Sequence, residues 1–398
     1  MPFSLNDLTA ALDEAAIRRT RRLQPAGGPG DKILPPTYPP DQSGKPPRHV
    51  YEQRRVDGEL KDCVLLDSVA SQANRLEEVL VSAVREDGLA LPMLEVDFAG
   101  TDIADLGRIS AMEAPHRVFD AIIRDSRHEG TPFGDSALGK ALKQARTDRA
   151  TTMLENAPAA LLFGAWNSTG EGGGLGAKFP RCITSEIVGI DAAQGQTVGS
   201  RLDPLGTSRD VTVYVDENRN WALDPKDLDT KNPRQVRPSE INHSNVMPSV
   251  EPRGVTLDHA RHSAVLTLAG LRRLRFPDND GAHTAERDRA GRAVLAAMGL
   301  LALTRQDRAG YALRSRCDLV PEEPGTFELV RRDGSVEPLD LDADSARTLY
   351  DDAVAEARRA GFAWSPNPVR LTPEDRLVEL VRKSRDKALA GQAEPGDG

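Results

Sequence analysis

Aromatic side chains are scarce in this 398-residue chain, at 4% of its residues. This scarcity argues against a surface that binds nucleic acid mainly by stacking bases on aromatic rings. Cysteine is also rare, since Cys63, Cys182 and Cys317 are isolated and form no CxxC pair, which fits a reduced protein without a disulfide or zinc framework. No apolar run is long enough for a signal peptide or a membrane span, so we expect a cytoplasmic protein.

An excess of positive charge is lacking as well. The chain has 52 Lys and Arg against 61 Asp and Glu, a net charge of −9, so no global basic field attracts nucleic acid or an anionic membrane. The charges are unevenly placed, however. Residues 253–276 hold five arginines against Asp258 alone, whereas residues 321–359 hold eleven acidic against five basic residues. The balance therefore permits a local basic face.

The most distinctive stretch is LLFGAWNSTGEGGGLGAKFPRCITSEIVGI, residues 161–190. Its centre, residues 167–176, is dense in glycine, which loses more backbone freedom on folding than any other residue. A chain accepts that cost where its backbone must approach something closely, and bare glycine amides form an anion-binding concavity. Lys178 and Arg181 follow this loop, and Ser168 and Thr169 open it.

Several interpretations of this loop compete. A P-loop requires Lys directly after the last glycine and then Ser or Thr, but here Gly176 is followed by Ala177, Lys178 and Phe179. A dinucleotide fingerprint must open a helix, whereas Pro180 and the β-branched residues after it predict a strand. Two interpretations stay open: a cradle for a polynucleotide backbone, and a hairpin tip with incidental cations.

A second candidate site follows a short buried strand at residues 63–67. Ser68 is a suitable N-cap for a helix that extends through Arg85, and its first turns carry Ser71, Gln72, Asn74 and Arg75. A strand that leads into a helix with such groups suits phosphate binding. The alternative is an ordinary solvated helix face.

Apolar spacing predicts the other elements. We expect helices at residues 4–22, 109–127 (interrupted near Pro115), 134–149, 256–275, 287–304, 345–361 and 372–389. We expect strands at residues 93–98, 183–190, 211–215, 311–319 and 326–331. Arg272, Arg273 and Arg275 would end one helix, where cations also suit the helix dipole.

Two segments are too rich in Pro, Gly or Asn for regular structure. Residues 25–47 predict an extended arm, in which Ile33, Leu34 and Tyr38 pack against the same domain or a neighbouring copy. Residues 218–252 are too long for a structureless loop in a compact core, so we interpret them as an insertion with a functional surface.

Five blocks together resemble a known family. They are CVLLDSVASQANRLEE, AMEAPHRVFDAIIRDS, the glycine block above, HSNVMPSVEPRGVT and LRRLRFP, within residues 27–321. They resemble the backbone subunit of type I-U (now type I-G) CRISPR effector complexes, which is a RAMP-superfamily protein of antiviral defence. The acidic segment from Pro321 onward is less typical of that family.

The resemblance implies an α+β fold, a modified RNA-recognition-motif (ferredoxin-like) core with long insertions. The expected organisation is an N-terminal helix and arm (1–47), one such domain (48–390) with insertions at about 99–180 and 216–252, and a disordered tail (391–398). The resemblance implies that the protein binds guide RNA (crRNA) through the sugar-phosphate backbone of the RNA. This agrees with the absence of RNP1, the aromatic motif on which ordinary RNA-recognition motifs stack bases. The residues carried over are Ser71, Gln72, Asn74, Arg75, His116, Arg117, Ser168, Thr169, Gly172, Gly173, Gly174, Gly176, Lys178, Arg181, Arg272 and Arg273.

The implied function is non-catalytic. Copies would polymerise head to tail along the guide in a Cascade-like helical filament, with target DNA pairing to the guide. Other partners would be a large subunit, an RNA-end-capping and processing subunit and a recruited helicase-nuclease; we expect no cofactor and no metal.

Two other classes of function stay open at this point. The first is a metal-dependent endoribonuclease that cuts target RNA, with Asp203, Asp210 or Asp216 as the acidic residue. No carboxylate pair with a nearby His forms a recognisable acid–base or metal site in the sequence. The second is a nucleotide-binding metabolic enzyme, against which the failed P-loop register counts.

Overall fold

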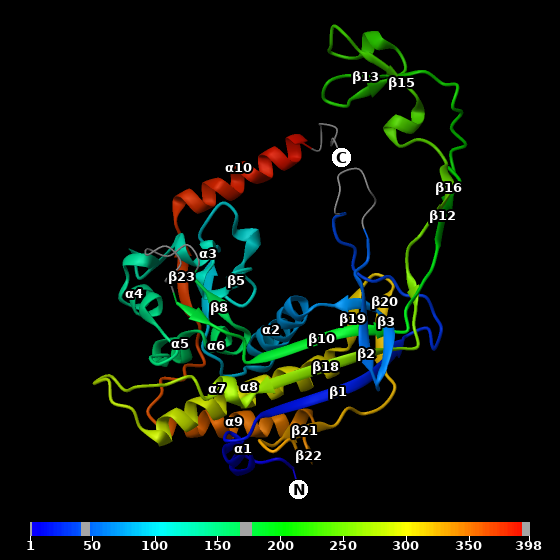
Figure 1. The fold of residues 1–398 in the computed structure, drawn as a ribbon. Coiled ribbons are helices and arrows are strands. Elements are labelled where there is room, and N and C mark those ends of the chain that lie inside the picture. Colours follow the sequence, from blue (N-terminus) through cyan, green and yellow to red (C-terminus); the bar gives the residue numbers. More distant parts are fainter. Residues whose placement is uncertain (1, 41–47, 168–176, 392–398) are drawn as a thin grey trace. The chain divides into compact units, whose positions relative to one another are not determined.

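The computed structural model describes residues 2–40, 48–167 and 177–391, and its fold is α+β (Figure 1). Contacts divide the chain into two units. One comprises Met1–Ala193 and Thr256–Leu377, and the other comprises Gln194–Val255 and Val378–Gly398. Each unit is described by itself below.

The larger unit is built on an antiparallel sheet in the order β19-β20-β1-β18-β10-β3-β2, with β21 beside β1 and β22 beside β21. The strands are β1 Ala16–Pro25, β2 Tyr51–Val56, β3 Glu59–Asp67, β10 Ile183–Ile190, β18 His259–Thr267, β19 Tyr311–Arg314, β20 Cys317–Pro321, β21 Phe327–Val330 and β22 Val336–Leu339. In Figure 1, β1, β18 and β10 lie side by side.

The centre of this sheet has the connectivity of the split β-α-β motif. Along the chain, β1 is followed by α2 (Val69–Asp87), β10, β18, α8 (Ala285–Ala309) and β20, while the spatial order is β20-β1-β18-β10. This is the β-α-β-β-α-β arrangement of ferredoxin-like folds. The helices α2 and α8 pack against each other, and β3 and β2 extend the sheet beyond β10. The expected RNA-recognition-motif-like core is therefore present.

The predicted helix at residues 4–22 is wrong beyond its first two turns. The helix α1 covers only Leu5–Ala11, capped by the Ser4 side chain, and β1 follows from Ala16. Ile17, Arg19 and Leu23 are buried in β1 while the residues between them are more exposed, a period of two that belongs to a strand. The apolar stripe of the short helix ends at Leu12. In the strand that follows, buried and exposed side chains alternate, with Arg19 buried and Arg18 exposed.

The predicted helix at residues 256–275 is also wrong. Its first half is β18, a central strand paired with β1 on one side and β10 on the other, and only α7 (Leu268–Leu271) is helical. Ala260, His262, Ala264 and Leu266 are buried in alternation. Leucines at helical spacing misled the prediction, because pairing with two neighbouring strands overrides a weak helical preference.

Residues 109–127 form no long helix either. They contain β5 (Arg108–Ser110), the 3₁₀ turn η2 (Arg117–Phe119), α3 (Ala121–Arg124) and the start of β6 (Ser126–His128). Arg117 has φ +53, a left-handed conformation that interrupts a right-handed helix, and Asp120 caps α3 by accepting from the Ile122 amide. A second sheet here has the order β5-β4-β23-β6-β7, with β4 Leu94–Asp97, β7 Thr131–Pro132 and β23 Val369–Pro373.

Most remaining elements agree with the sequence predictions. Strands β3, β4, β10 and β21 and helices α2, α8, α9 (Ala343–Arg359) and α10 (Asp375–Gly391) lie where they were expected. Residues 134–149 are helical only in part (α4, Ala137–Gln144), and residues 311–319 form the hairpin of β19 and β20 instead of one strand. The short helices α5 (Thr151–Asn156) and α6 (Pro158–Phe163) precede the glycine loop.

The described part of the proline-rich arm packs on the larger unit itself. Ile33 is buried, and the Leu34 amide donates to the Arg316 carbonyl at 2.8 Å. Residues 41–47 of the arm lie outside the described residues.

The smaller unit contains the whole of the insertion predicted at residues 218–252. Strands β12 (Thr197–Arg201) and β16 (Val246–Glu251) form an antiparallel ribbon, and β13 (Val213–Val215) pairs with β14 (Trp221–Ala222) and β15 (Arg234–Val236). Val213, Val215 and Val236 form a small apolar core with Ile241 packed against it.

The helix α8 is buried along most of its length, and its two glycines give a matched test of the packing around it. A Cβ on Gly291 would lie 2.6 Å from the Phe276 ring, whereas the nearest atoms to a Cβ on Gly299 are side-chain ends at 3.4 Å. We expect Gly291→Ala to destabilise the protein by about 1–3 kcal/mol through overpacking. Gly299→Ala should be neutral or stabilising by up to about 1 kcal/mol, because Ala is the better helix former.

Urea denaturation of both variants beside the wild type tests this prediction. Equal destabilisation by the two substitutions would show that α8 does not pack as described.

Candidate nucleic-acid interface

The strands β8 (Ala165–Trp166) and β9 (Lys178–Phe179) flank the glycine loop as a short antiparallel pair. The Asn167 amide donates to the Ala177 carbonyl at 2.9 Å and extends this pairing by one step. The sequence-predicted residues Ser168, Thr169, Gly172, Gly173, Gly174 and Gly176 lie outside the described residues. The described interface is therefore the base of the loop.

Gly164 is the turn that leads from α6 into β8, and only glycine fits there. Its φ is +86, which L side chains rarely adopt. A Cβ would also lie 2.9 Å from Cγ of Arg181 and 3.2 Å from the Phe179 carbonyl oxygen. This close approach brings the start of β8 against the residues that follow β9.

Arg117 fixes this turn from the side of α2. Its Nε and Nη2 each donate to the Glu77 carboxylate at 2.6 Å, and its Nη1 donates to the Gly164 carbonyl at 3.2 Å. Glu77 is only 1% exposed. Burial raises the pKa of Glu77 to about 6, although the hydrogen bonds and charge of Arg117 act in the opposite direction.

Arg181 contacts the same turn and remains exposed. Its Nε donates to the Phe163 carbonyl at 3.1 Å. The protein around its guanidinium, and then the charge of Arg117, lower the pKa of Arg181. His116 is exposed beside Arg117, and its amide donates to Asp120. Arg117 and Arg181 therefore contact the same turn, although they are far apart in the sequence, and His116 adjoins Arg117.

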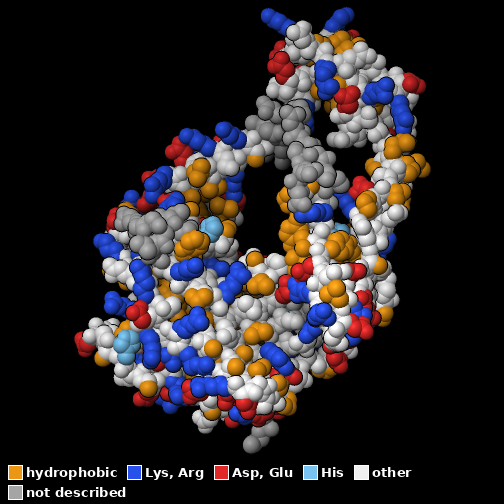
Figure 2. Space-filling model, in the orientation of Figure 1, with side chains coloured by type: hydrophobic (Ala, Val, Ile, Leu, Met, Phe, Trp, Pro, Cys, Tyr) orange, Lys and Arg blue, Asp and Glu red, His pale blue; other side chains and the backbone are white. Residues whose placement is uncertain are grey.

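Together with Lys178, we call these residues the hairpin cluster: His116, Arg117, Lys178 and Arg181. Lys178 is exposed, and its ammonium lies 5.2 Å from the centroid of the Trp166 ring. Among the described residues, neither Lys178 nor Arg181 has a carboxylate within ion-pair distance, whereas many other arginines of the chain do. Figure 2 shows that Lys and Arg side chains are numerous on the visible face of the larger unit despite the acidic net charge. The hairpin cluster can thus receive an anion.

The second group of predicted residues surrounds Asp67 at the end of β3. Asp67 is fully buried and accepts from Ser71 Oγ at 2.7 Å, Gln72 Nε2 at 2.7 Å and Arg75 Nε at 2.9 Å. Arg314 donates to it as well, at 3.2 Å. Ser71, Gln72 and Arg75 thus each donate to Asp67; Gln72 is buried, Ser71 and Arg75 are partly exposed, and Asn74 is exposed on α2.

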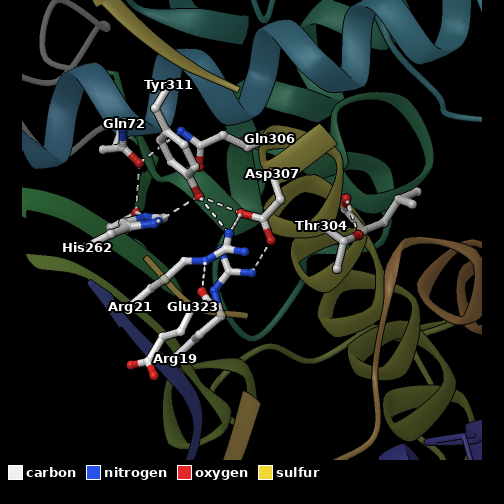
Figure 3. A network of polar contacts seen from close by, with 11 residues as sticks. Arg19, Arg21, Gln72, His262, Thr304, Gln306, Asp307, Tyr311 and Glu323 are labelled. Carbon is white, nitrogen blue, oxygen red and sulfur yellow. Dashed lines mark hydrogen bonds and ion pairs between the residues drawn. The ribbon is translucent and has the colours of Figure 1, made fainter. Parts of the chain in front are cut away.

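Gln72 also joins Asp67 to a buried polar network. Figure 3 shows this network with Gln72, His262 and Tyr311. Its Oε1 contacts Ser185 Oγ at 2.9 Å, and Ser185 in turn lies 2.7 Å from His262 Nε2. The Tyr311 hydroxyl lies 3.2 Å from His262 Nδ1 and donates to Asp307, which pairs with Arg19 and Arg21. Burial, followed by the charges of the two arginines, lowers the pKa of His262 well below its usual value.

The two remaining predicted arginines lie at the end of α7. Arg272 is half-buried, and its Nη1 donates to the carbonyls of Leu12 at 2.8 Å and Glu14 at 2.5 Å, so it anchors the chain after α1. Arg273 is exposed. The structure therefore does not bring Arg272 into the hairpin cluster or the Asp67 group.

Sequence reasoning did not single out Glu77, Asp67 or Trp166. Glu77 and Asp67 act as buried partners of arginines, and a residue's burial is decided by tertiary packing. Trp166 carried a signal that could have found it, namely an aromatic residue directly beside a polar glycine loop in a chain poor in aromatics.

The described residues also bear on metals and membranes. In residues 2–40, 48–167 and 177–391, no three His, Cys, Asp or Glu side chains are grouped closely enough to hold a metal ion. None of the described helices is both long and apolar enough to cross a lipid bilayer.

The raised pKa of Glu77 predicts a pH dependence of stability. Because the folded state binds this proton more tightly than the unfolded state, whose pKa is near 4.5, the contribution of Glu77 to stability falls as the pH rises through about 6. Each pKa unit corresponds to about 1.4 kcal/mol, so the expected loss is about 2 kcal/mol between pH 4.5 and 7. Glu77→Gln should remove this part of the pH profile.

Denaturant unfolding at several pH values, with Glu78→Gln on the exposed face of α2 as the matched control, measures the effect. Parallel pH profiles for wild type and Glu77→Gln would contradict it.

Comparison with known proteins shows that about the first half of the chain is similar to one family. Residues 17–194, from β1 through β11 (Ala193–Gln194), match the model of a family described as CRISPR-associated protein GSU0053. The match includes α2, the Asp67 group except Arg314, and the whole hairpin cluster. No curated protein matches the chain. The part of the chain that carries the candidate interface is therefore similar to a CRISPR-associated protein family.

Proposed function

We propose that this protein is a guide-RNA-binding backbone subunit of a type I CRISPR interference complex, of the I-U (I-G) subtype. The family match indicates a role in CRISPR interference, with RNA and other CRISPR-associated subunits as partners. The finer assignment is supported above all by one observation: Lys178 and Arg181 are exposed at the base of the glycine loop without a carboxylate partner among the described residues.

The chemistry of the hairpin cluster fits a phosphate backbone. Arg117 neutralises Glu77, which leaves Lys178 and Arg181 as the net positive charge of the cluster. Exposed cations that contact phosphates position a strand without reading its sequence. A subunit that holds a guide for pairing with target DNA needs this kind of contact, because the pairing edges of the bases must stay free.

We further propose that copies of the chain assemble along the guide, together with the large subunit, the RNA-end-capping and processing subunit and the recruited helicase-nuclease. Head-to-tail contacts that do not close produce open helical assemblies, which suits a subunit repeated along one RNA strand.

The same proposal includes the absence of catalysis. Asp203 accepts from the amides of Leu205 and Thr207 at 2.9 and 3.0 Å, and these hydrogen bonds lower its pKa. Asp216 likewise accepts from Asn220 at 2.7 and 2.8 Å. Carboxylates used in this way organise turns of the smaller unit.

A cleavage assay with labelled guide and target RNA in magnesium and manganese should therefore yield no products. Cleavage that needs metal and disappears in Asp203→Ala, Asp210→Ala or Asp216→Ala would instead establish the ribonuclease.

Replacing Lys178 and Arg181 together by Gln should weaken the binding of every guide sequence about equally. Removing one cation that binds a phosphate of a single strand flattens the dependence of log K on log salt by about 0.7, so the double variant should show a slope shallower by about 1.4. The free energy of unfolding should fall by only about 1 kcal/mol, because one hydrogen bond is lost, from Arg181 to the Phe163 carbonyl, and exposed cations otherwise contribute little.

RNA affinity at several salt concentrations measures this change. The charge-matched control is Arg308→Gln with Arg359→Gln, two exposed arginines with carboxylate partners on α8 and α9. A folded Lys178/Arg181 variant with the slope of the wild type would show that the hairpin serves the fold alone.

A further inference from the structure

Trp166 is an exposed tryptophan in a chain with three tryptophans. Its exposed fraction is 52%, compared with 3% for Trp364. Tryptophan is usually well buried, because its large apolar ring gains from leaving water. A half-exposed indole therefore calls for a partner that covers it in the working protein.

The position of Trp166 is fixed by the contacts already described. It lies two residues after Gly164, in the turn that Arg117 and Arg181 contact through the carbonyls of Gly164 and Phe163. Trp166 is the cross-strand neighbour of Lys178 in the β8–β9 pair. Because the backbone of Trp166 is held in this way, little backbone freedom is lost when a flat partner stacks on its ring.

The surroundings of the ring are cationic. The Lys178 ammonium lies 5.2 Å from the ring centroid, in the range of a cation–π contact, and Arg181 follows β9. A half-exposed indole with the Lys178 ammonium over its ring combines the two elements by which proteins bind single-stranded nucleic acid, a stacking surface for a base and charge for the backbone.

We propose that Trp166 is a stacking platform for one nucleobase of bound single-stranded RNA, with Lys178 on the adjoining phosphate. This inference rests on the proposed function and adds a contact to it that is not ionic. An apolar side chain of a second copy is the competing occupant. The RNA base is favoured because a protein partner would have to supply carboxylates for Lys178 and Arg181, whereas a nucleotide carries its own phosphate.

Stacking and phosphate contacts leave different signatures, and the experiment separates them. Trp166→Ala should weaken RNA binding about tenfold for homopolymers of every base, since all bases have a stacking face. The slope of log K against log salt should remain that of the wild type, because no cation is removed. Trp166→Phe should retain part of the affinity.

Fluorescence provides a second, independent readout. In a Trp221→Phe background the emitting residues are Trp166 and the buried Trp364, so RNA should quench the exposed component. The quench should vanish when Trp166→Phe is added. Tyr51→Ala, at an aromatic residue of comparable exposure (42%) on β2, is the matched control and should leave RNA affinity unchanged.

Each result decides the matter. RNA that binds Trp166→Ala as tightly as wild type, without quenching Trp166, overturns the platform while the proposed function stands. If copies of Trp166→Ala fail to assemble although their RNA affinity is that of the wild type, the ring contacts another protein copy, and the stacking platform is overturned. If the wild-type protein binds no RNA at any salt concentration, the proposed function itself fails.

Discussion

The requirement that every buried charge be paired governs the centre of this protein. Arg19 points from the middle of β1 into the interior, where its side chain is 2% exposed. An isolated charge in such a place is prohibitively costly, and removing one partner of a buried pair typically costs about 3–5 kcal/mol. Asp307, near the end of α8, supplies the opposite charge, and the Phe327 ring lies under the guanidinium at 4.7 Å. The pair thereby fixes how α8 and β21 lie against β1.

The same requirement extends from this pair across the sheet. Asp307 accepts from Tyr311, Tyr311 contacts His262 of β18, and His262 contacts Ser185 of β10. From Ser185 the chain of contacts continues through Gln72 of α2 to Asp67 of β3. One connected set of polar side chains therefore joins five strands of the sheet, β19, β1, β18, β10 and β3, and both core helices. Because polar networks in a low-dielectric interior favour one arrangement, this set helps to specify the register of the sheet.

The pairing of a buried charge also organises the hairpin cluster near the surface. Glu77 of α2 is buried and compels Arg117 to pair with it, and Arg117 then holds the Gly164 carbonyl. The turn so fixed presents Trp166 and Lys178 on two adjacent strands. A charge pair inside the protein thus orients groups that have no carboxylate partner among the described residues, which gives the proposed interface a rigid support.

The sequence by itself determined the parts of the fold that depend on local patterns. Ser68 and the apolar spacing after it predicted α2, continuous apolarity predicted the buried helix α8, and β-branched residues predicted β10. The glycine-dense loop and its two following cations located the candidate interface at β8 and β9. These features need only neighbours a few residues away, so the sequence displays them directly.

Only the tertiary structure decided the roles of residues whose partners are distant. Leucines around β18 have helical spacing, yet hydrogen bonding to β1 and β10 makes that segment a strand. Gln72 and Arg75 were predicted from the sequence to bind RNA, and only the structure shows that both donate hydrogen bonds to Asp67, a buried carboxylate that must be satisfied. Arg117 and Arg181 are 64 positions apart and meet only because Gly164 allows α6 to turn sharply into β8. Burial and long-range pairing arise when the chain closes on itself, and for that reason no local pattern contains them.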